Sequence, residues 1–180
     1  MDIVKKRGEI ISLETRSLVS QRYKRITRAV NMEFWSSTSD TSHSLYVGSY
    51  GRGTATDASD IDMLVELPKD EYNRYEAHKG NGQSRLLQAV KDAILCTYPN
   101  SKIHADGQVV DIDFSNGIKF EVLPVFRQLD WWGNWNGKYD YPDTNMGGKW
   151  LTTDPKAEQK AMKECNDDSN GLLFDTCRHM

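Results

Sequence analysis

The chain has 180 residues, a net charge of −3 and 38% hydrophobic residues. These values indicate one globular domain, or one domain and part of another, and the charge gives no indication of a nucleic-acid partner. No apolar run reaches the roughly 20 residues of a membrane span, and the charged N-terminus lacks the apolar core of a signal peptide. Three scattered cysteines without a C-x-x-C motif indicate reduced thiols, so we predict a cytoplasmic protein with no membrane partner.

A long helix is predicted over residues 9–34, because apolar residues recur there at helical spacing. Basic residues lie between the apolar ones. They form either a solvated face or a positive wall beside a bound triphosphate. The apolar residues are Leu18, Val19, Tyr23, Ile26 and Val30, and the basic ones are Arg16, Arg22, Lys24, Arg25 and Arg28. A polar loop then leads to a short strand at residues 45–47.

Residues 48–65 combine a glycine-containing turn with two acids at the start of a strand. Backbone N–H groups of the turn, residues 48–53, can approach a phosphate. A strand is predicted over residues 61–67. Asp60 directly precedes it and Asp62 lies within it, and alternation places both side chains on one face. Two carboxylates aimed at one point repel each other unless a cation lies between them, and their oxygens suit Mg²⁺ or Mn²⁺. The stretch therefore predicts phosphoryl or nucleotidyl transfer.

Pro68 ends this strand, and a polar segment containing glycines follows it. A second helix is predicted from Ser84 to the residue before Pro99. We expect Cys96 to pack on its core face as a small hydrophobic residue.

Residues 109–126 predict a β-hairpin with a turn at residues 115–117. A three-residue loop pairs Asp111 with Glu121 and keeps the apolar residues on one buried face, whereas a two-residue loop would mix the faces. Directly opposed Asp111 and Glu121 repel each other, and a metal or a basic neighbour would relieve this.

Residues 131–150 are rich in aromatic and turn-forming residues. The aromatic side chains either pack in the core or provide a platform for a nucleobase, for which Tyr141 and Trp150 are candidates.

A third helix is predicted to begin at Asp154 and Pro155 and to run to about Cys165. Residues 166–171 are expected to break it, and residues 172–180 are expected to start another apolar helix.

The pattern G-S-x₁₀-D-h-D-h, in which h is apolar, resembles the nucleotidyltransferases of the DNA polymerase β superfamily. A narrower resemblance to the cGAS/DncV-like nucleotidyltransferases (CD-NTases, SMODS-type) rests on residues 46–54, 59–62, 120–126 and 147–150, with 154–155 soon after. This resemblance extends from about residue 15 to the end. It implies the α+β polymerase β-like fold, with a mixed or antiparallel sheet flanked by helices. It also implies a catalytic domain over residues 1–152 and the start of a helical domain over residues 153–180.

The resemblance implies a catalytic site with two divalent ions, Mg²⁺ or Mn²⁺. Asp60 and Asp62 would bridge both ions, and Glu121 would bind the ion beside the attacking ribose hydroxyl. Many relatives have Asp at the third position, and Asp111 and Asp113 are alternatives to Glu121 in this chain.

The resemblance also implies a site for a nucleoside triphosphate. Gly48 and Ser49 would hold the triphosphate, and Arg52 and Thr54 are further candidates for nucleotide binding. Attack of the hydroxyl on the α-phosphate would release pyrophosphate.

By this resemblance the chain would make a cyclic di- or oligonucleotide second messenger in bacterial antiphage (CBASS-type) signalling, where an effector protein senses the product. One alternative is a nucleotidyltransferase that modifies a protein, an RNA or a small molecule. Another is a truncated nucleotide-binding domain without activity.

Relatives continue into a helical domain beyond the point where this sequence stops. We therefore expect an exposed apolar C-terminal end that favours self-association, formed by Leu172, Leu173, Phe174 and Met180.

Overall fold

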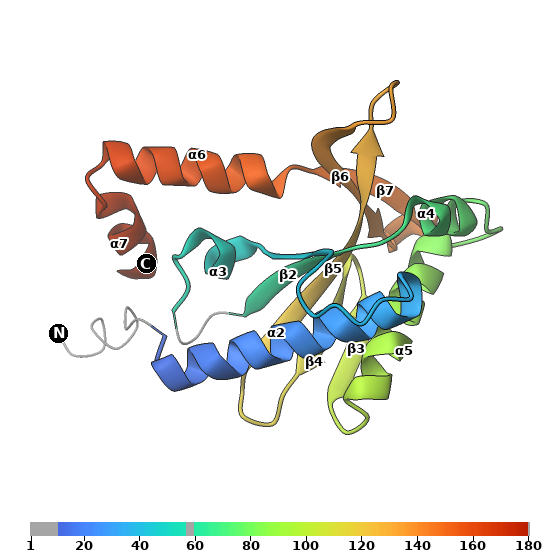
Figure 1. Cartoon of the computed structure of the whole chain (residues 1–180), viewed down its shortest axis with the longest axis horizontal. Coiled ribbons are helices and arrows are strands. Elements are labelled where there is room, and N and C mark those ends of the chain that lie inside the picture. The colour runs from blue at the N-terminus through green and yellow to red at the C-terminus, as the bar shows by residue number, and fades with distance from the viewer. Residues whose placement is uncertain (1–10, 57–59, 180) are drawn as a thin grey trace.

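The structure is a computed structural model of the chain, and it describes residues 11–56 and 60–179. A mixed sheet with strand order β1-β2-β5-β4-β3 forms its centre (Figure 1). Only β2 and β5 of this order run parallel; the other neighbours are antiparallel. The strands are β1 (Ser44–Tyr46), β2 (Ile61–Glu66), β3 (Lys102–Asp106), β4 (Val109–Asp113) and β5 (Lys119–Leu129). This arrangement confirms the predicted α+β fold with a mixed sheet flanked by helices.

Helices α2 (Leu13–Phe34) and α5 (Gly82–Thr97) pack against this sheet in one hydrophobic core. Ser12 caps α2, so the helix begins at Leu13 and the predicted start is too early for residues 11 and 12. Residues 9 and 10 of the predicted helix lie outside the described residues. Val19, Ile26 and Val30 are fully buried, as the helical spacing predicts. Of the described helices, none is long and apolar enough to cross a membrane.

The prediction that Cys96 packs in the core is wrong, because this thiol is exposed. It lies on the side of α5 opposite to the face that buries Val90 and Ile94.

The register of the β4–β5 hairpin confirms the three-residue turn. Asp111 lies opposite Glu121, and Ile112 lies opposite Phe120. The Phe114 N–H donates to the Ile118 carbonyl at 3.1 Å and closes the turn. Because this register keeps the apolar residues on one face, the acids share the other face.

Four further elements were not predicted: α4 (Lys69–Glu76), β3, β6 (Trp135–Asp143) and β7 (Lys149–Thr153). β6 pairs with the extended end of β5 and with β7, so the aromatic segment is largely strand. Gly137 and Pro142 within β6 disfavour a strand in sequence reasoning.

Helix α6 (Pro155–Asp168) begins as predicted, because Asp154 accepts a hydrogen bond from the Ala157 N–H at 2.9 Å. It continues three residues beyond Cys165, so the predicted break is placed too early. The chain turns instead at Asn170 and Gly171, which have left-handed φ values of 54° and 87°.

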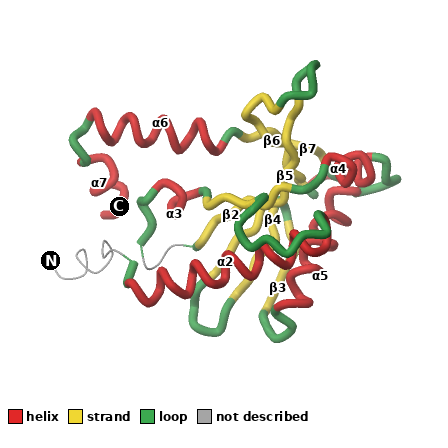
Figure 2. Tube along the Cα trace, viewed as in Figure 1, coloured by secondary structure: helices red, strands yellow, loops and turns green. Residues whose placement is uncertain are grey.

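Helix α7 (Leu172–His179) follows, and α6 extends over α3 (Figure 2). Leu172 is 66% exposed, whereas Leu173 and Phe174 are half-buried. Met180, the fourth member of the predicted apolar end, lies outside the described residues.

Candidate active site

The predicted turn after β1 is a short helix, α3 (Gly48–Arg52), which corrects the sequence interpretation. Gly53 ends it in the left-handed conformation, with φ 75°, and its N–H bonds to the carbonyls of Ser49 and Tyr50. The Thr54 N–H and hydroxyl both donate to the Ser49 carbonyl, at 2.9 and 3.3 Å. Thr54, a candidate nucleotide-binding residue, is buried and stabilises this turn.

The start of α3 is packed directly against the Asp62 carboxylate on β2. Gly48 has φ +57°, and a Cβ on it would lie 1.8 Å from Asp62 Oδ2. The Val47 N–H donates to the Asp62 carbonyl at 3.0 Å, and the Ser49 backbone is close enough to the Asp62 carboxylate to lower its pKa slightly. Only glycine allows this close approach, so Gly48 and Asp62 form one structural unit.

Asp62 lies beside Glu121 because β2 and β5 pair in parallel at these two residues. Both side chains lie on the same face of the sheet, and each carboxyl group is near enough to affect the pKa of the other. Burial raises the pKa of Asp62, and the neighbouring Asp60 raises it further. Burial also raises the pKa of Glu121, followed by the charges of Asp62, Asp111 and Asp60. A divalent cation would relieve this repulsion.

The carboxylates supply hard oxygen donors of the kind that Mg²⁺ and Mn²⁺ prefer. Within residues 11–56 and 60–179, however, no group of three or more Asp, Glu, His or Cys side chains is close enough to hold a metal. Asp60 is exposed, yet it is near enough to affect the pKa of both Asp62 and Glu121. The donor chemistry therefore fits a divalent ion at the Asp62–Glu121 pair, and the full ligand set stays a prediction.

The two alternatives to Glu121, Asp111 and Asp113, lie on β4, which β5 separates from β2. Asp113 pairs with Lys119 at 3.6 Å and with Lys102 at 3.9 Å. Asp111 faces Glu121 across the hairpin. Of the three acids, Glu121 is the one paired directly with Asp62, so the geometry favours it as the third carboxylate.

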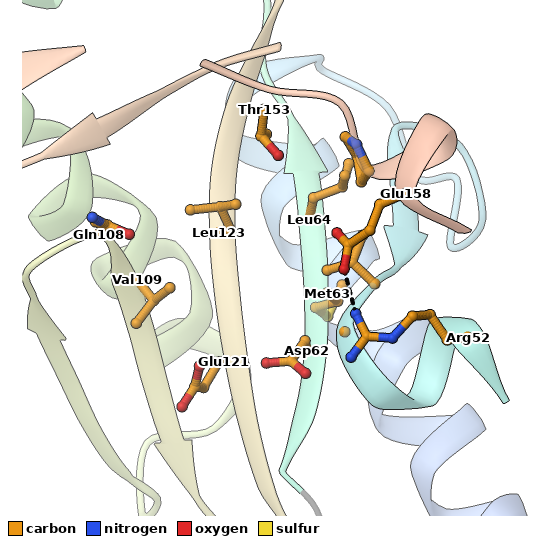
Figure 3. A pocket seen from close by; sticks show the side chains of 13 residues that line it. Arg52, Asp62, Met63, Leu64, Gln108, Val109, Glu121, Leu123, Thr153 and Glu158 are labelled. Atoms are coloured by element: carbon orange, nitrogen blue, oxygen red, sulfur yellow. Dashed lines mark hydrogen bonds and ion pairs between the residues drawn. The ribbon is translucent and has the colours of Figure 1, made fainter. Parts of the chain in front are cut away.

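Arg52 is held by an acid from another part of the chain. Its Nη1 donates to Glu158 Oε1 on α6 at 2.6 Å, while its Nε is buried without a hydrogen-bond partner (Figure 3). The spacing of 106 residues hides this pair from sequence reasoning. Arg52 thus lines the site with its guanidinium already neutralised.

A cavity of about 260 Å³ lies over these groups. Arg52, Asp62 and Glu121 form its charged side, and Leu64, Leu123 and Val109 form apolar surface. Gln108, from the turn between β3 and β4, also lines it (Figure 3). Sequence reasoning missed Gln108 because β3 was not predicted.

Two of the basic residues of α2 pack on aromatic rings. The Arg22 guanidinium lies 3.9 Å from the centre of the Phe114 ring, and that of Arg25 lies 4.9 Å from the centre of the Tyr98 ring. Burial lowers the pKa of Arg22. These two residues therefore pack on aromatic rings, and neither lines the cavity.

The two candidate stacking residues also pack within the protein. Trp150 contacts Tyr72 and Phe126, with ring centres 4.7 and 5.5 Å away, and its indole N–H donates to Glu76. Tyr141 packs against the second core cluster, around Leu64. Neither lines the cavity, so the structure favours the packing interpretation.

Replacement of Trp150 by Ala should lower the free energy of unfolding by about 2 kcal/mol, because the side chain is half-buried against two aromatic rings. Nucleotide affinity should stay unchanged. Urea unfolding and calorimetric titration would measure the two quantities. Trp131→Ala is the matched control, since Trp131 is 94% exposed and its removal should cost almost nothing. A loss of nucleotide affinity without a loss of stability would contradict the packing role.

The mixed sheet, with a glycine-started helix packed on a carboxylate-bearing strand, defines the polymerase β-like nucleotidyltransferase fold. The chain belongs to the Second Messenger Oligonucleotide or Dinucleotide Synthetase (SMODS) domain family, which matches residues 6–166. No curated protein sequence matches the chain.

Solved structures with this fold include three bacterial enzymes. The CdnE cyclic dinucleotide synthase of Elizabethkingia meningoseptica, with GTP and Apcpp, has a TM-score of 0.65 at 15% identity, over 99% of this chain and 63% of that one. The CdnE c-UMP-AMP synthase of Rhodothermus marinus, with Apcpp and Upnpp, has a TM-score of 0.62 at 15% identity, over 98% of this chain and 63% of that one. The DncV cyclic AMP-GMP synthase of Vibrio cholerae, with a linear intermediate, has a TM-score of 0.54 at 17% identity, over 75% of this chain and 36% of that one. The chain thus spans less than two thirds of each of these enzymes.

Proposed function

We propose that this chain is the catalytic part of a nucleotidyltransferase that makes a cyclic di- or oligonucleotide from nucleoside triphosphates. The observation that carries the proposal is the close contact of Gly48 and Ser49 with Asp62, which itself pairs with Glu121. This contact places a glycine backbone suited to phosphate beside carboxylates suited to a divalent ion.

Each residue of the unit has a role in the proposed reaction. Gly48 and Ser49 hold the triphosphate. Asp60, Asp62 and Glu121 would hold two Mg²⁺ or Mn²⁺ ions, which when bound would activate a ribose hydroxyl and neutralise the departing pyrophosphate. The hydroxyl oxygen forms a bond to the α-phosphorus, and the bond from that phosphorus to the bridging oxygen of the β-phosphate breaks.

Arg52 adds a positive charge beside the triphosphate. In the structure its guanidinium is bound to Glu158. A phosphate group that binds at Nη1 would replace this exposed carboxylate. Because Glu158 remains largely in water, it can leave at a small cost in free energy.

The biological setting we propose is bacterial antiphage signalling of the CBASS type, in the cytoplasm. The product would be a second messenger sensed by a separate effector protein. Membership of the SMODS domain family supports the second-messenger product, since the family is described as a second-messenger synthetase. The antiphage setting follows from the resemblance of the sequence to the CD-NTases.

The test is incubation of the chain with α-³²P-labelled nucleoside triphosphates and Mg²⁺, followed by phosphatase treatment and chromatography. A phosphatase-resistant product is expected, and EDTA should abolish it. Label transferred to a protein, an RNA or a small molecule would instead establish the alternative acceptor class. If the chain binds nucleotide but transfers no label to any acceptor, it is a nucleotide-binding domain without activity.

A further inference from the structure

The turn between β3 and β4 places one amide side chain at the edge of the active-site cavity. Asp106 pairs with Val109, so Gly107 and Gln108 form a two-residue turn. Gly107 has φ 59°, as such tight turns require, and its carbonyl accepts from the Thr144 N–H at 2.8 Å. Gln108 therefore starts from a backbone that is anchored to the rest of the fold.

The Gln108 amide has no hydrogen-bond partner among residues 11–56 and 60–179. The charged groups of the same cavity have neighbours within the protein, since Arg52 binds Glu158 and Asp62 lies against Gly48 and beside Glu121. Gln108 is half-buried and lines the cavity across from Arg52 (Figure 3). It therefore offers both donor N–H groups and an acceptor oxygen to a ligand.

Apolar surface separates Gln108 from the carboxylates. Strand alternation places Val109 on the same face as Asp111, and Leu123 on the same face as Glu121. Leu123 is two residues from Glu121, or about 7 Å along the strand. A flat aromatic ring can lie on this apolar surface when the phosphates of the same ligand lie at the carboxylate end.

We infer that Gln108 reads the nucleobase of the bound nucleoside triphosphate. A Gln amide pairs with the edge of a nucleobase through two hydrogen bonds, one donated and one accepted. This inference rests on the proposed function, since it assumes that a nucleotide occupies the cavity.

The test is calorimetric titration of the full chain with ATP, CTP, GTP, UTP and inorganic tripolyphosphate, with Mg²⁺ present. The wild type should bind one of the four nucleotides most tightly. Gln108→Leu should weaken binding of that nucleotide about tenfold and remove the preference among the bases. Tripolyphosphate affinity should stay within about twofold, because that ligand has no base. Gln88→Leu is the matched control, since this exposed amide donates to Asp92 on the same helix.

Three results would overturn the inference. An unchanged preference among the bases in Gln108→Leu, or equal affinity of the wild type for all four nucleotides, would overturn it although nucleotide binding itself is confirmed. An equal loss of nucleotide and tripolyphosphate binding would show a general effect on the site rather than base reading. If the wild type binds neither ligand, the proposed function fails together with this inference.

Discussion

Replacement of Asp62 by Asn should abolish Mg²⁺-dependent nucleotide binding and reduce any transferase activity by more than about 10³-fold. The same change should not unfold the chain. Burial and the nearby acids raise the pKa values of Asp62 and Glu121, so their charged forms are less favourable in the folded state than in the unfolded state. Loss of one of these charges should therefore leave stability at pH 7 unchanged or raise it by less than about 1 kcal/mol.

Calorimetric titration with a nucleoside triphosphate and Mg²⁺ would measure the loss of binding, and urea unfolding at pH 7 would measure stability. Asp113→Asn is the matched control, because Asp113 pairs with Lys102 and Lys119 and should not affect binding. Wild-type nucleotide affinity in the Asp62→Asn protein would contradict the metal role. A loss of nucleotide affinity in the Asp113→Asn protein but not in the Glu121→Gln protein would show that the third carboxylate is Asp113 on β4.

The second large effect is expected for Gly48→Ala. The new Cβ would lie 1.8 Å from Asp62 Oδ2, and the residue would have to keep φ +57°. Conformational strain costs about 1–2 kcal/mol for a residue with a Cβ, and the overlap forces either α3 or Asp62 to move. We expect a loss of about 3 kcal/mol in the free energy of unfolding, with loss of tripolyphosphate binding in the protein that remains folded.

Gly53→Ala separates these two causes. Gly53 also has a positive φ, +75°, but a Cβ there meets no atom within 4 Å. The free energy of unfolding of the Gly53→Ala protein should fall only by the cost of the positive φ, about 1–2 kcal/mol. This variant should keep most of its affinity for tripolyphosphate. Equal losses of stability and affinity in the two variants would show that the contact with Asp62 has no special importance.

Local patterns predict the elements that have one clear apolar face. The helical spacing of Val19, Ile26 and Val30 predicts α2, and alternation with a three-residue turn predicts the β4–β5 register. Helix α4 lacks such a face, since its eight residues bury only Tyr75. Its acids in the first turn and Arg74 in the last turn favour a helix, and this signal was available in the sequence. The sequence predicts a turn where α3 lies, because five residues are too few to show a helical period.

Local patterns in the sequence indicate the groups at the centre: a glycine–serine pair, two alternating aspartates and a third acid on a nearby hairpin. These patterns are local, because spacing along a strand decides which side chains share a face. The contacts between distant parts of the chain follow from the tertiary structure. Parallel pairing of β2 and β5 places Asp62 beside Glu121, packing of α6 brings Glu158 to Arg52, and the β3–β4 turn brings Gln108 to the cavity. Such contacts depend on strand order and helix packing, which join residues far apart in the chain and leave no local pattern.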